Sequence, residues 1–77
     1  MKADLTGTVM EKYTREHNKD GQNFERMYLR LYQPGERVNV DVLVKTDTYM
    51  QVEEGQKIKI EDCTITTFNN YLYAKQN

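Results

Sequence analysis

One short run, residues 26–32 (RMYLRLY), constrains the fold more than any other part of the chain. Successive side chains of a β-strand point to opposite faces of a sheet, so this run puts Met27, Leu29 and Leu31 on one face. The opposite face alternates arginine with tyrosine, at Arg26, Tyr28, Arg30 and Tyr32. The run therefore predicts a strand with one side in an apolar core and a cationic, aromatic side on the surface.

Other runs share this period of two and predict further strands. We expect them at residues 5–14, about 24–33, about 37–45, 57–61 and 71–74. The polar run 16–23 and the Pro34-Gly35 pair are predicted as loop and turn. The apolar parity slips between Ile60 and Cys63, which predicts a bulge or sharp bend at Glu61-Asp62. Residues 46–54 do not alternate and allow one short helical turn.

These elements predict an all-β protein whose five strands form the small Greek-key barrel called the OB-fold. We expect residues 1–77 to form this single domain. The predicted core is mostly aliphatic and consists of Leu5, Val9, Met27, Leu29, Leu31, Val38, Val40, Val42, Val44, Ile58, Ile60, Cys63 and Ile65. A core this small leaves no room for a large enzymatic cleft.

The charge balance limits where a polyanion can bind. The chain has 11 Lys and Arg against 12 Asp and Glu, a net charge of -1. General attraction to nucleic acid is therefore not expected, and any such site has to be local. Cys63 has no partner for an intrachain disulfide, and no apolar run is long enough for a membrane span or a signal peptide. These features predict a cytoplasmic location.

The arginine and tyrosine face is the best candidate for a binding site. Guanidinium groups pair with phosphates and phenol rings stack on bases, so the face predicts binding of single-stranded nucleic acid. The predicted contact residues are Arg26, Tyr28, Arg30, Tyr32, Lys45, Tyr71 and Tyr73. The same residue types also suit a solvated strand face, and the two C-terminal tyrosines suit an edge strand that closes the barrel.

The chain also resembles the small helix-destabilising single-stranded-DNA-binding proteins of filamentous phages, and OB-fold DNA-binding proteins of mobile elements. The resemblance extends over about residues 20–75 and lies in GQNF (21–24), VDVLVK (40–45), EGQKIKI (54–60) and FNNYL (68–72). It implies a non-catalytic protein that coats single strands, often as a homodimer. The chain departs from these proteins in its net charge, and Glu25, Glu36 and Asp41 are expected close to the proposed site.

Several other functions are disfavoured. The sequence has no nucleophile elbow, no phosphate-cradling glycine loop and no Cys/His cluster, so we expect no enzyme, no cofactor and no metal site. His17, the only histidine, falls in the polar run. We expect DNA as the partner in preference to RNA. The alternative is a protein-interaction module or assembly subunit that uses the same face, because arginine and tyrosine are also enriched at protein interfaces.

Overall fold

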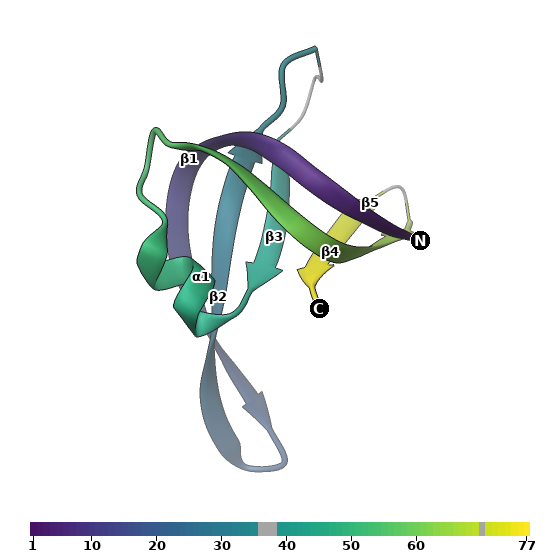
Figure 1. Ribbon diagram of the computed structural model, residues 1–77. Coiled ribbons are helices and arrows are strands. Elements are labelled where there is room, and N and C mark those ends of the chain that lie inside the picture. Colours follow the sequence, from purple (N-terminus) through teal and green to yellow (C-terminus); the bar gives the residue numbers. More distant parts are fainter. Residues whose placement is uncertain (36–38, 70) are drawn as a thin grey trace.

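The computed structural model describes residues 1–35, 39–69 and 71–77. Within these residues the elements are β1 (Lys2–Lys19), β2 (Gln22–Tyr32), β3 (Val40–Val44), α1 (Thr46–Gln51), β4 (Lys57–Phe68) and β5 (Tyr71–Gln76). The strands close into a barrel in the order β1-β2-β3-β5-β4 (Figure 1). The predicted all-β class, with its five strands and one short helix, is confirmed.

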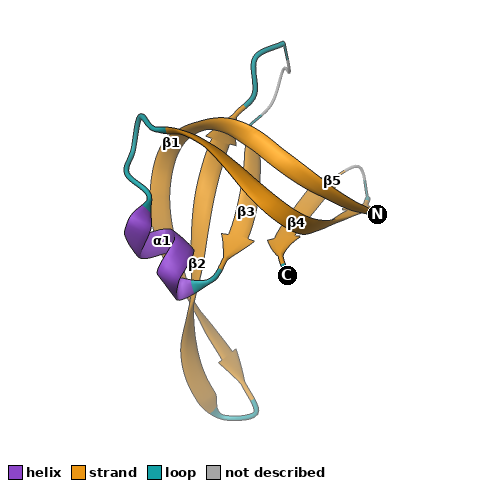
Figure 2. Cartoon of the chain, viewed as in Figure 1, coloured by secondary structure: helices purple, strands orange, loops and turns teal. Residues whose placement is uncertain are grey.

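Strand β1 is long because it pairs with two different strands. Its first part pairs with β4 from Lys2 to Thr8, and its second part pairs with β2 from Thr8 to Lys19. The register shifts between Val9 and Glu11, which lets the strand curl around the barrel, as Figure 2 shows. Gly7 lies in this curl, where a Cβ atom would come within 2.7 Å of the Tyr32 carbonyl oxygen.

Strands β1 and β2 continue beyond the barrel as a two-stranded ribbon (Figure 1). The prediction of a loop at 16–23 is therefore wrong, because both strands run up to the turn at Asp20 and Gly21. These two turn residues have positive φ angles of 55° and 79°. The run is polar because a free-standing ribbon leaves both of its faces exposed to water. The backbone ladder still pairs, with Asn18 opposite Asn23.

The bend in β4 occurs where the apolar parity slips. Asp62 has a φ of 56°, and Ala3 and Leu5 of β1 pair with Cys63 and Ile60 of β4. Between these two pairs β1 has one residue, Asp4, and β4 has two, Glu61 and Asp62, which is a bulge. The bulge turns both Ile60 and Cys63 into the core, so the predicted bulge at 61–62 is confirmed.

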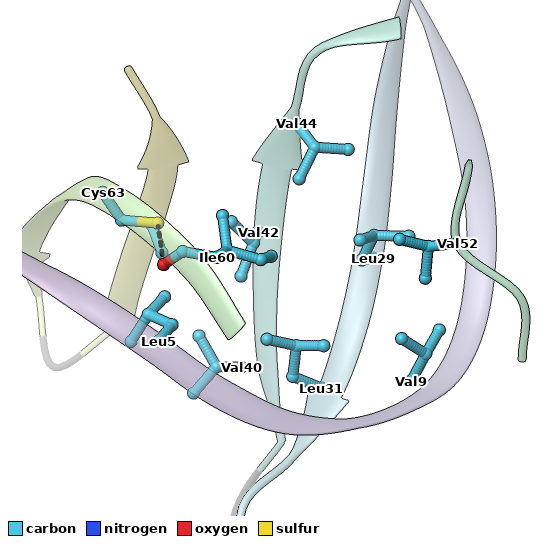
Figure 3. Packing of buried hydrophobic residues seen from close by; sticks show 11 residues of the cluster. Leu5, Val9, Leu29, Leu31, Val40, Val42, Val44, Val52, Ile60 and Cys63 are labelled. Atoms are coloured by element: carbon cyan, nitrogen blue, oxygen red, sulfur yellow. Dashed lines mark hydrogen bonds between the residues drawn. The ribbon is translucent and has the colours of Figure 1, made fainter. Parts of the chain in front are cut away.

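The interior of the barrel matches most of the predicted core (Figure 3). The buried members are Leu5, Val9, Leu29, Leu31, Val40, Val42, Val44, Val52, Ile60, Cys63 and Ala74, with Met27, Ile58 and Ile65 half-buried against them. Ala74 was not predicted, and Val38 lies outside the described residues. The Cys63 thiol donates a hydrogen bond to the Ile60 carbonyl oxygen at 3.5 Å, and burial raises its pKa, so it is a core residue.

Helix α1 covers one end of the barrel. Tyr49 packs against the core, and the Lys12 ammonium lies 4.4 Å from the centre of its ring. The Glu54 carboxylate accepts a hydrogen bond from the Lys12 backbone amide at 3.2 Å, which ties the turn after α1 to β1. In the part of the chain that the structure describes, no helix is long and apolar enough to cross a membrane.

Candidate nucleic-acid interface

The outward faces of the five strands share one row of side chains. The register places Tyr13 opposite Tyr28, and Tyr28 opposite Leu43. It continues with Leu43 beside Lys75, and Lys75 opposite Thr64. One row of side chains therefore crosses β1, β2, β3, β5 and β4, with rings and an aliphatic residue at one end and a cation near the other.

This surface is hollowed by two adjoining cavities of about 640 and about 590 Å³. Both are lined by Arg26, Leu43 and Lys75, so we treat them as one groove, named here the Tyr28 groove. The other side chains used below are Tyr13, Arg15, Tyr28, Asp41 and Tyr73 in the first cavity, and Glu25 and Lys45 in the second. The Lys45 amide donates to Gln76 Oε1 at 2.9 Å, which holds the end of β3 beside β5.

Two tyrosines lie flat against each other in the groove. The ring centres of Tyr13 and Tyr28 are 5.2 Å apart and their planes differ by 10°. The Tyr13 hydroxyl donates a hydrogen bond of 2.6 Å to Asp41 Oδ2. Burial, together with this hydrogen bond, raises the pKa of Tyr13 to about 12, so the phenol is neutral at physiological pH.

Arg30 is held by carboxylates on both sides. Its Nε donates to Asp41 Oδ1 at 2.9 Å, its Nη2 to Asp41 Oδ2 at 3.3 Å, and its Nη1 to Glu11 Oε2 at 2.9 Å. Burial alone would raise the pKa of Asp41, but the hydrogen bonds from Arg30 and Tyr13 outweigh it and hold that pKa below its usual value. The positive charge of Arg30 is thus balanced within the protein.

Two other arginines oppose each other where the ribbon leaves the barrel. Arg15 on β1 is the direct cross-strand partner of Arg26 on β2. In the described part of the chain the ion pairs are those of Arg30 and Lys59, so neither of these arginines is neutralised there. Like charges directly opposite each other destabilise a strand pair. An anion placed between them would relieve that repulsion.

The same face continues along the ribbon. His17 is opposite Phe24, with ring centres 5.1 Å apart, and Phe24 is exposed. Along this face a tyrosine pair, an arginine pair and a His17/Phe24 pair therefore follow one another at alternate residues. Glu16 and Glu25 oppose each other one position out of phase, so Glu16 lies on the reverse face of the ribbon, while Glu25 also lines the second cavity of the groove.

The structure brings together only some of the predicted site residues. Arg26, Tyr28, Lys45 and Tyr73 line the groove. Arg30 points to the same face but is paired with Asp41 and Glu11. Tyr32 is exposed at the far end of β2, opposite Thr8, and is not among the described lining residues. Tyr71 belongs to β5, and its side chain and Glu36 lie outside the described residues.

Other lining residues were missed by the sequence analysis, namely Tyr13, Arg15, Leu43 and Lys75. The alternation of Glu11, Tyr13, Arg15 and His17 carried a signal for Tyr13 and Arg15. This signal was missed because a loop was assigned from residue 16. Among the described residues, no cluster of His, Cys, Asp and Glu has the size and spacing to hold a metal ion.

Comparison with known proteins supports the fold. No family model and no curated protein matches the chain. Among solved structures, it is similar to the OB domain of Ta0387 from Thermoplasma acidophilum, with a TM-score of 0.65 and 14% identity. The match covers 94% of this chain and 63% of that chain, so the chain spans less than two thirds of that structure. At this identity the likeness shows the fold alone, and the prediction of an OB-fold is confirmed.

Proposed function

We propose that the protein is a non-catalytic, sequence-tolerant binder of single-stranded nucleic acid, with DNA preferred, and that the strand lies in the Tyr28 groove. One observation carries this proposal: the groove joins exposed or half-buried rings to a cluster of cations in a chain whose net charge is -1. The cations are Arg15, Arg26, Lys45 and Lys75.

The distribution of charge supports a local site for a polyanion. Arg15 and Arg26 repel each other across the ribbon, whereas Glu16 lies on its reverse face. The cost of opposing two arginines has no compensation from an ion pair within the described residues. A phosphate supplies that compensation, because a guanidinium group binds it through two parallel hydrogen bonds.

The aromatic residues explain why a single strand is preferred to a duplex. Tyr28 and Tyr73 line the groove, and Tyr73 is 54% exposed. An unpaired base can stack on such a ring, which contributes about 1–3 kcal/mol per base. In a duplex the bases are already stacked and paired, so their faces are not available. This outer face of β2 and β3 is also the surface that OB-folds use for oligonucleotides.

Fluorescence anisotropy with a labelled oligothymidylate tests the proposal. We expect binding at low salt that weakens as salt rises, and little binding to a duplex of the same length. Equal binding to the duplex would show that only charge is involved. No binding to the single strand at low salt would refute the proposed function.

A protein partner is the second candidate for the same surface. Leu72 and Tyr73 are 46% and 54% exposed beside Leu43, and exposed rings and aliphatic side chains are typical of protein interfaces. A partner pull-down is the next experiment if the oligonucleotide does not bind.

The homodimer and the phage or mobile-element origin implied by the resemblance remain part of the proposed nucleic-acid-binding function. Light scattering in solution tests the dimer.

A further inference from the structure

A carboxylate in a groove for polyanions needs an explanation. Asp41 is half-buried, lines the groove and keeps its charge, because its pKa is held below the usual value. A negative charge repels phosphate, so an acid at this point weakens binding unless it does something else. Its contacts show what that is.

Asp41 accepts hydrogen bonds from two different strands. From β1 it receives the Tyr13 hydroxyl at 2.6 Å, and from β2 it receives Arg30 Nε at 2.9 Å. Arg30 also donates to Glu11, so the guanidinium is fixed from both sides. The carboxylate is thereby held in one position and serves as an anchor for the tyrosine.

The anchored tyrosine supports the ring that faces the groove. Tyr13 is stacked on Tyr28 at 5.2 Å with a 10° angle between the planes. The centre of the Arg30 guanidinium lies 5.4 Å from the centre of the Tyr13 ring, so the same arginine that fixes Asp41 also packs near this ring. Tyr13 is therefore restrained at its hydroxyl, by Tyr28 and by Arg30.

We propose that Asp41 and Arg30 are positioning residues, which hold Tyr13 flat against Tyr28 so that the two rings form a preorganised stacking platform for a base. The inference rests on the proposed function. In this role Arg30 contacts no phosphate, and Asp41 strengthens binding although its charge opposes it. The benefit is entropic, because the ring need not be ordered when the base arrives.

Two substitutions separate this role from that of a bystander acid. Asp41→Asn removes a negative charge from the groove, so a bystander role predicts tighter binding. The positioning role predicts binding weaker by about three- to tenfold, which corresponds to the loss of one hydrogen-bonded restraint. Tyr13→Phe keeps the ring and the charge and removes only the hydroxyl. It is expected to weaken binding to the same extent.

The controls use charge and additivity. Glu16→Gln removes an acid from the reverse face of the ribbon, outside the groove lining, and is expected to leave the affinity unchanged or slightly raise it. The double variant of Asp41→Asn with Tyr13→Phe is expected to bind no more weakly than either single variant, because both remove the same restraint. The dependence of affinity on salt should stay that of the wild type in Tyr13→Phe, since no cation is lost.

The outcomes distinguish the inference from the proposed function. If wild type binds the oligothymidylate and Tyr13→Phe binds equally well, or Asp41→Asn binds more tightly, the positioning role is wrong and the proposed function stands. If wild type does not bind, the proposed function itself fails. Thermal unfolding is measured for each variant, and Tyr13→Phe carries the test alone if Asp41→Asn is unfolded at the assay temperature.

Discussion

Replacing Arg26 by alanine should change how strongly binding depends on salt. The groove has four cations without an ion pair among the described residues, namely Arg15, Arg26, Lys45 and Lys75. If each neutralises one phosphate of a single strand, log Kd rises with log salt concentration with a slope of about 2.8. Arg26→Ala lowers this slope to about 2.1.

These slopes correspond to easily measured changes in affinity. Between about 50 mM and about 200 mM salt, wild type is expected to lose affinity about fiftyfold, and Arg26→Ala only about twentyfold. The assay is a titration of labelled oligothymidylate at several salt concentrations. The matched control is Lys57→Ala, which also removes one positive charge, but from the surface formed by β1 and β4 away from the groove.

The stability of the variant provides a further check. Arg26→Ala relieves the repulsion from Arg15 across the ribbon. We therefore expect no decrease in melting temperature from the loss of this charge. A weaker salt dependence in a stably folded variant is thus a binding effect. If Arg26→Ala and Lys57→Ala give the same slope as wild type, the reasoning about phosphate contacts in the groove is refuted.

Three further predictions follow from particular contacts. Tyr28→Ala should cost about 1–3 kcal/mol of binding free energy in the oligothymidylate titration, whereas Tyr32→Ala, at the far end of β2, should leave the affinity unchanged. Gly7→Ala should lower the free energy of unfolding in urea by about 1–3 kcal/mol, since its Cβ would lie 2.7 Å from the Tyr32 carbonyl oxygen, and an unchanged stability would contradict the close approach. Tyr13 has a folded pKa of about 12 against 10.0 in the unfolded chain, so its contribution to stability is present below pH 10 and is lost as pH rises from 10 to 12. Urea unfolding across that range should show a steeper loss for wild type than for Tyr13→Phe.

The sequence predicted the barrel well because the barrel strands bury one face in the apolar core. Leu29, Leu31 and Val42 are completely buried, and each falls on the apolar phase of an alternating run. The slip of that phase before Cys63 correctly located the bulge in β4. In these segments, burial on one face determines the register, so the pattern of residue types is sufficient.

The ribbon could not be predicted on the same basis. It has no buried side, so Glu16, Asn18 and Asn23 give no alternation of polar and apolar residues. A polar run with an Asp-Gly pair is typical of a loop, and only the pairing of the two strands shows where the turn begins. For this reason the opposed Arg15 and Arg26 were not recognised as neighbours.

The role of Arg30 depends on residues distant in sequence. Its partners Glu11 and Asp41 lie on the two neighbouring strands of the barrel, and they meet it only after the strands pair. The sequence of β2 alone shows two equivalent arginines. The three-dimensional structure separates Arg26, which lines the groove without an ion pair among the described residues, from Arg30, which is neutralised.

The most direct test of the central claim is to map the binding site by NMR. Amide resonances of ¹⁵N-labelled protein are followed while unlabelled oligothymidylate is added. A strand in the Tyr28 groove predicts that the largest shifts occur at Arg26, Tyr28, Leu43 and Lys75. Shifts concentrated instead on the surface at residues 6–8 and 57–59, or spread evenly over the barrel, would contradict the claim that this groove holds the single strand.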